Sequence, residues 1–164
     1  MATQRKKVKP YHYTECGLDN IYLVNGFKFV ETPRGTGIVI TNIEGLHNVI
    51  GDMLVEERKD LNGAEFRFLR HELDMTQLGL AVVLGVDVQS VARWEKGQTK
   101  GPIDRPAQSI LRLLYKEFRN DNRKIKEILH EVAELDEKPH KLPEGLKFNP
   151  AKHAWETSEL PEAA

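Results

Sequence analysis

The sequence predicts an α+β protein, in which a small N-terminal strand-rich unit with a helix precedes an all-helical domain. Three observations support this fold class. Strand-like apolar runs separated by glycine-containing turns fill residues 21–40. From residue 43 to 118, apolar residues recur at offsets of three and four, the spacing of one helix face. A length of 164 residues, with 40% hydrophobic and 30% charged, suits one globular domain or two small ones.

The first 60 residues divide into a basic arm and the strand-rich unit. Residues 1–10 carry four basic side chains and no acid, so we expect a flexible basic arm. Residues 21–24 and 27–30 are strand-like and flank Asn25-Gly26, a dipeptide that predicts a hairpin turn. Residues 33–37 break the chain before a third strand over 38–40. From Ile43 to Leu54 the spacing predicts a helix that completes the unit over residues 11–60.

Residues 61–118 have the strongest helical periodicity, with four or five short amphipathic segments separated by brief breaks. An additional helix is predicted over residues 119–135, with an apolar stripe that includes Ile125 and Ile128. Beyond it, residues 136–164 are rich in proline, glutamate and lysine. We expect an acidic, flexible tail there.

Charge and cysteine content limit the function classes. The net charge of −1 gives no overall basic signature, but residues 66–118 hold eight basic and six acidic side chains, and residues 131–164 hold four basic and eight acidic ones. The single cysteine, Cys16, excludes an intramolecular disulfide and an all-cysteine metal site. His12 lies four residues away, but two ligands are too few for structural zinc. No apolar run approaches roughly 18 residues, so we expect a cytoplasmic protein without a membrane span.

Residues 76–97 predict two short helices joined by a tight turn. Thr76 suits a helix N-cap, since its hydroxyl can accept from a backbone N–H of the first turn. Gly85 can end that helix with positive φ, and Asp87 can cap the next one. Two such helices form a helix-turn-helix, whose second helix enters the DNA major groove.

Residues 76–97 contain a set of motifs at fixed spacing: Thr76-Gln77, Leu80-Ala81, Leu84-Gly85-Val86, Val91, Trp94-Glu95 and Gly97. At these positions the segment resembles the DNA-binding domain of the XRE, or lambda-repressor-like, family of transcriptional regulators. The resemblance implies an all-helical lambda-repressor-like DNA-binding domain over residues 61–118, with Val91 and Trp94 directed to the core.

A broader resemblance rests on residues 11–20, 44–47 and 63–70. With these stretches, residues 11–118 resemble the MqsA-type antitoxin group of regulators. Members of that group bind zinc through two Cys-x-x-Cys pairs in the N-terminal unit. This chain has only Cys16, so we expect neither that metal site nor any other cofactor.

The XRE resemblance also implies roles for residues of the second helix. Arg93 is placed to bond guanine and Gln89 to bond adenine, while Val88 or Ala92 touches a thymine methyl. Gln77 would reach a phosphate through its side chain or its backbone N–H, the residues after the helix would also contact phosphates, and Ser90 would make a secondary contact. The complete set of expected DNA-contacting residues is Gln77, Val88, Gln89, Ser90, Ala92, Arg93, Lys96, Gln98, Thr99 and Lys100.

The sequence therefore predicts a transcriptional regulator that binds double-stranded DNA as a homodimer and represses by occluding its operator. One alternative is an antitoxin that binds a toxin protein through the N-terminal unit and regulates its own expression. Another is a protein-interaction module that keeps the fold without binding DNA. An enzyme is the least supported class. Glu44 and His47 could imitate an acid–base pair, but no nucleophile or third group accompanies them.

Overall fold

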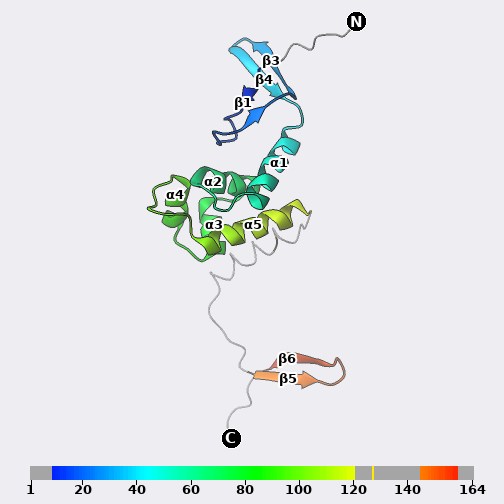
Figure 1. Cartoon of the computed structure of the whole chain (residues 1–164). Helices are drawn as coiled ribbons and strands as arrows, with labels where there is room; N and C mark the ends of the chain where they lie inside the picture. Colours follow the sequence, from blue (N-terminus) through cyan, green and yellow to red (C-terminus); the bar gives the residue numbers. More distant parts are fainter. Residues whose placement is uncertain (1–8, 121–126, 128–144, 159–164) are drawn as a thin grey trace. The chain divides into compact units, whose positions relative to one another are not determined.

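The computed structural model describes residues 9–120, 127 and 145–158, which fall into two compact units, Met1–Ala133 and Glu134–Ala164. In the described part of the first unit, short strands precede five helices (Figure 1). The second unit contains one pair of strands in its described part. The expected arm over residues 1–10 and the expected helix over 119–135 lie outside the described residues, apart from residues 9–10, 119–120 and 127.

The strands of the first unit form two separate antiparallel pairs. Strand β1 (Tyr11–His12) pairs with β2 (Tyr22–Leu23), and β3 (Phe27–Thr32) pairs with β4 (Gly35–Ile40). In β3–β4 the register places Phe29 opposite Ile38. The ring of Tyr11 contacts those of Phe27 and Phe29, with centroids 5.5 and 5.9 Å apart, so β1 covers part of one face of the longer pair.

The prediction of a hairpin at Asn25-Gly26 is wrong, because the strands on either side of this dipeptide do not pair with each other. Gly26 has a positive φ of 78°, but Asn25 does not, so the two-residue turn that needs positive φ at both positions is not formed. Instead, the Gly26 carbonyl accepts a hydrogen bond from the Thr41 N–H at 2.8 Å. The tight turn lies within the predicted break, where Gly35 has φ 116° and the Thr32 hydroxyl donates to its carbonyl.

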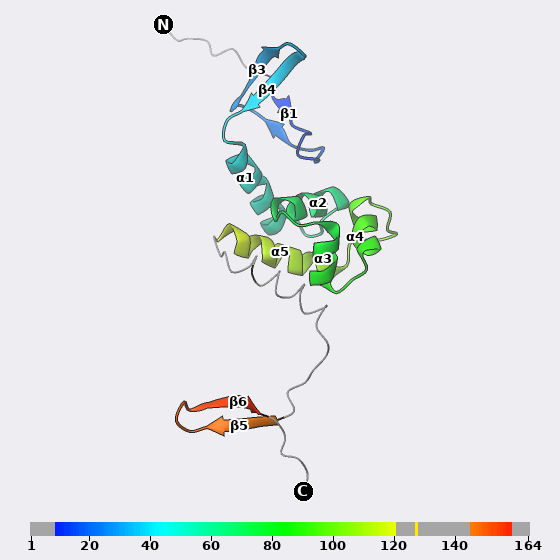
Figure 2. The ribbon, with the colours of Figure 1, turned by 180° about the vertical axis from the view of Figure 1, so that it is seen from behind.

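The five helices pack around one hydrophobic core. Helix α1 (Ile43–Glu56) runs from the strands into the cluster, as both views show (Figures 1 and 2). Helices α2 (Gly63–Glu72), α3 (Gln77–Leu84), α4 (Val88–Glu95) and α5 (Arg105–Arg119) complete it. Their most deeply buried large side chains are Tyr115, Phe66, Leu69, Leu80, Leu111 and Val91.

Helix α1 is fastened to α5 by polar and apolar contacts. The Arg112 guanidinium donates to the carbonyls of Leu54 and Val55 at 3.0 and 2.8 Å, which satisfies acceptors in the last turn of α1. Gly51 lies against the ring of Tyr115, where a Cβ would be only 2.0 Å from the phenol oxygen. Burial raises the pKa of that phenol to about 12. The predicted boundary between residues 60 and 61 therefore falls inside one compact unit.

The second unit contradicts part of the expected flexible tail. Strand β5 (Gly145–Asn149) pairs antiparallel with β6 (Ala154–Ser158), and Phe148 lies opposite Trp155 in the register. Apolar residues alternate along the first strand at positions 146 and 148, a spacing that favours strands. The composition of residues 136–164 hid this short pattern, because the surrounding prolines and charges dominate it.

Candidate nucleic-acid interface

Side-chain caps define the helix pair α3–α4. The Thr76 hydroxyl accepts from the Gly79 N–H at 2.9 Å and so begins α3. Gly85 ends α3 in the left-handed conformation, with φ 65°. The Asp87 carboxylate then accepts from the Gln89 N–H at 2.6 Å and begins α4. Only residues 85–87 separate the two helices, so their mutual angle is set by a short, specifically capped turn.

The inner face of α4 packs against the rest of the helical cluster. Val91 is fully buried, beside Leu80 and Ala81 in the core. The indole of Trp94 meets the ring of Phe66 edge to face, with centroids 5.8 Å apart. The expectation that Val91 and Trp94 are core residues is confirmed. Because both anchor the same side of an eight-residue helix, the opposite side is left outward.

A buried ionic network holds the C-terminal end of α4. The Arg70 guanidinium donates to both carboxylate oxygens of Glu95, at 2.6 and 2.9 Å, and also to the Met75 carbonyl at 2.7 Å. Gln77 adds a third bond to Glu95, at 2.8 Å. Burial alone would raise the pKa of Glu95, but the bonds from Arg70 and Gln77 lower it below its usual value. Glu95 therefore remains ionised and ties α4 to α2 and α3.

The sequence does not reveal this network directly. Arg70 and Glu95 are 25 residues apart and belong to different helices, so no local spacing connects them. The one available signal was the helical spacing of α2, which places Arg70 four residues after Phe66 and therefore on its apolar face. A buried arginine requires an acidic partner, and that requirement pointed to a search for one.

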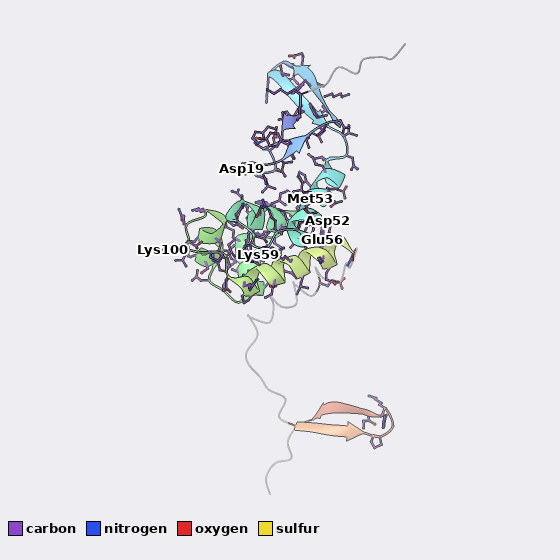
Figure 3. The ribbon with its side chains drawn as sticks, in the orientation of Figure 1. Asp19, Asp52, Met53, Glu56, Lys59 and Lys100 are labelled. Carbon is purple, nitrogen blue, oxygen red and sulfur yellow. The ribbon has the colours of Figure 1, made fainter. Side chains whose placement is uncertain are left out.

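The outer face of α4 and the segment after it carry only positive charge. Between residues 88 and 100 the sole acid is Glu95, which is turned inward, whereas Arg93, Lys96 and Lys100 are exposed. Lys100 lies at the edge of the cluster next to α4 (Figure 3). The Arg93 guanidinium donates to the Ser90 hydroxyl at 3.3 Å, and in the described part of the chain it joins no ion pair. This is a small, uncompensated basic surface.

The ten residues expected at the DNA interface fall into two groups. Half of them are exposed: Gln89, Arg93, Lys96, Gln98 and Lys100. The other half are partly buried: Gln77, Val88, Ser90, Ala92 and Thr99.

Two of the partly buried residues differ from their expected roles. Val88 packs against the hydrophobic core instead of facing outward, because it lies at the first turn of α4 above the core. The Gln77 amide is bonded to Glu95 rather than held out for a phosphate. The hydroxyl of a third residue, Thr99, donates a hydrogen bond to the Gly101 carbonyl. Fewer polar side chains therefore face outward from this surface than the sequence predicted.

His47 has different partners from those weighed on sequence. Its Nδ1 lies 2.8 Å from a Glu72 oxygen and its Nε2 lies 2.8 Å from the Tyr13 hydroxyl, so Glu44 takes no part in the pairing. The His12 ring stacks on Tyr22, at a centroid distance of 4.5 Å, and its Nε2 lies 2.7 Å from the Asp19 carbonyl. The Cys16 thiol instead donates to the Tyr13 carbonyl. Across the described residues, no group of three or more His, Cys, Asp or Glu side chains is placed to hold a metal ion.

Comparisons with known proteins add no assignment. No protein-family model, curated protein or solved structure matches the chain. None of the helices in the described ranges has the length and apolar character that a membrane crossing demands.

Proposed function

We propose that the chain is a sequence-specific transcriptional regulator with a lambda-repressor-like helix-turn-helix, which binds double-stranded DNA through α4. The observation that carries the proposal is the outward face of α4. It offers Gln89 and Arg93 beside uncompensated basic residues, on a helix whose other side is anchored by Val91, Trp94 and Glu95. Rigid presentation of a few base-reading side chains is what groove recognition requires.

Two kinds of contact divide the proposed interface. The Arg93 guanidinium matches the acceptor pair of guanine, and the Gln89 amide matches the donor and acceptor of adenine. Ala92 is left as the apolar contact for a thymine methyl, because Val88 packs against the core. Lys96 and Lys100 supply phosphate contacts that position the helix without reading sequence.

A second copy completes the proposed mechanism. One eight-residue helix reads a single half-site, so useful affinity requires two. In a homodimer, the two α4 helices enter successive major grooves about 34 Å apart on one side of the duplex. A promoter covered in this way is closed to polymerase, and the regulator acts as a repressor.

The test is a binding titration of the full chain against a duplex selected from a randomised library, and against a scrambled duplex, at several salt concentrations. Arg93→Ala should lose about 1–3 kcal/mol of discrimination at one base pair. Lys100→Ala should weaken binding to all sequences and reduce the salt slope by about one. The control is Arg34→Ala, an exposed arginine in the turn between β3 and β4. Equal, weak, salt-sensitive binding of both duplexes would reject the proposal.

A second candidate, an antitoxin that binds a toxin protein, is favoured by one observation. Large apolar side chains of the strand region are exposed, among them Val24 at 71% and Phe29 at 59%. Co-expression with the product of the adjacent gene, followed by size-exclusion chromatography, tests this candidate. A stable complex that Phe29→Ser abolishes would support the antitoxin function, while separate elution of the two proteins would reject it.

A further inference from the structure

A cavity of about 440 Å³, lined by both polar and apolar groups, opens where the 15–17 loop meets helices α1, α2 and α4. Pockets of about 300–1,000 Å³ are the usual size for small-molecule sites. The 15–17 loop continues to Asp19, whose label in Figure 3 shows that the loop lies above α2 in that view. The apolar lining of the cavity comes from Ala64 and the buried Phe68, and its polar lining includes both positive and negative side chains. The polar residues that line it are Glu15, His47, Arg67, His71, Glu72 and Glu95.

One wall of the cavity offers hydrogen-bond donors. The Nε2 atom of His71 lies 3.4 Å from Arg67 Nε and 3.4 Å from Arg70 Nη2. Guanidinium groups only donate, so Nε2 accepts and the imidazole proton sits on Nδ1. That N–H and the terminal nitrogens of Arg67 have no partner in the described part of the chain. Burial, together with the charges of Arg70 and Arg67, lowers the pKa of His71 and favours this neutral form.

The other polar groups offer acceptors. Glu72 uses one carboxylate oxygen for His47, and Glu15 uses one for the Tyr11 hydroxyl. The second Glu72 oxygen has no partner within the described residues, whereas the Glu15 carboxylate also accepts from backbone N–H groups of its own loop. Glu95 is different, because Arg70 and Gln77 occupy both of its oxygens. The cavity therefore combines a cationic donor wall with two carboxylates, of which Glu72 keeps one oxygen for a further hydrogen bond.

We propose that this cavity binds a zwitterionic α-amino acid, with its carboxylate on Arg67 and His71 and its ammonium group on Glu72 and Glu15. A simple anion would meet the two carboxylates without compensation, and a simple amine would meet the Arg67 guanidinium without compensation. A zwitterion satisfies both walls at once, and its side chain contacts Phe68. The proposal does not depend on DNA binding, so either can fail without the other.

The test is isothermal titration of the full chain, at millimolar concentration, with each of the twenty common L-amino acids. The amino acid that binds is then compared with its deaminated carboxylic acid and its decarboxylated amine. Arg67→Gln should weaken binding about tenfold or more, because a charge-assisted contact to the carboxylate is lost. Glu72→Gln should also weaken binding about tenfold or more, because the charged contact to the ammonium group is lost. The amide oxygen of the new glutamine can still accept from His47.

Arg34→Gln, a change at an exposed arginine outside the cavity, is the control and should leave the affinity unchanged. Far-ultraviolet circular dichroism establishes that each variant is folded before titration. Binding of the amino acid alone, with loss in both cavity variants, supports the proposal. Failure of all twenty probes, equal binding by folded Arg67→Gln, or equal binding of the deaminated acid overturns it.

Discussion

Arg70 on α2 and Glu95 at the end of α4 form a bidentate pair, with N–O distances of 2.6 and 2.9 Å. Their side chains are 7% and 3% exposed, so water compensates neither charge if the other is removed. Arg70→Gln should therefore lower the free energy of unfolding by about 3–5 kcal/mol. The double variant Arg70→Met/Glu95→Leu should cost much less, since no buried charge is left alone. Urea denaturation at neutral pH measures both.

The matched control is the exposed pair between Arg119 and Asp52, at 3.2 Å. Arg119→Gln should change the free energy of unfolding by no more than about 1 kcal/mol, because water screens this pair. If the Arg70 and Arg119 variants lost similar stability, the buried network would not be what holds α4.

Gly63 provides a steric test of the same region. A Cβ at this position would lie 2.2 Å from the Trp94 carbonyl oxygen and 2.8 Å from that of Glu95. These are backbone atoms at the end of α4, so they cannot move aside as a side chain would. Gly63→Ala should destabilise the protein by about 1–3 kcal/mol or more, measured as a lowered urea midpoint.

Gly101 is the control glycine, because nothing lies within 4 Å of a Cβ added there and its φ is not positive. Gly101→Ala should stay within about 0.5 kcal/mol of the parent protein. A Gly63→Ala variant of unchanged stability would show that α2 and α4 are not in close contact in solution.

His71 gives stability a pH dependence. Burial and the charges of Arg70 and Arg67 lower its pKa in the folded protein below the ordinary value of 6.5. As the pH falls below 6.5, the unfolded chain therefore takes up a proton before the folded one does. The contribution of His71 should be constant above that pH and should decline as the pH falls toward the folded-state pKa.

Denaturant unfolding from about pH 8 to about pH 5 measures this slope. In His71→Gln the decline nearest pH 6.5 should be smaller, because the group that titrates there is absent. An identical slope in the variant would contradict the assignment. Glu95 acts at lower pH, where protonation of its carboxylate removes the stability that its lowered pKa reflects.

Local signals predicted the α3–α4 pair well. Thr76, Gly85 and Asp87 each act within three residues of their own position, so the sequence alone reveals the helix ends. The Asn25-Gly26 prediction failed for the opposite reason. Its outcome depends on which strands pair, and β3 finds its partner in β4 across Pro33 and Arg34. Pairing partners are a property of the whole fold, which local turn chemistry does not determine.

The candidate interface was predictable in composition but not in detail. Which residues of α4 are polar follows from the sequence, and helical spacing separates Val91 and Trp94 from Arg93. The engagement of Gln77 by Glu95 does not follow, because it requires the C-terminal end of α4 to meet the N-terminal end of α3. The cavity beside His71 was hidden for the same reason, since its walls come from the 15–17 loop and three helices.

The contacts of Arg112 determine how short a fragment of this protein can be made without losing support for α5. By donating to the carbonyls of Leu54 and Val55, Arg112 makes the last turn of α1 part of the structural support for α5. A fragment beginning at residue 61 would leave Tyr115 without its cover from Gly51 of α1 and would lack the carbonyl acceptors of Arg112. Gene fusions that transplant α3–α4 onto another protein must therefore carry α1 with them. The smallest fragment that keeps these contacts therefore runs from α1 to α5, and the α3–α4 segment alone is too short.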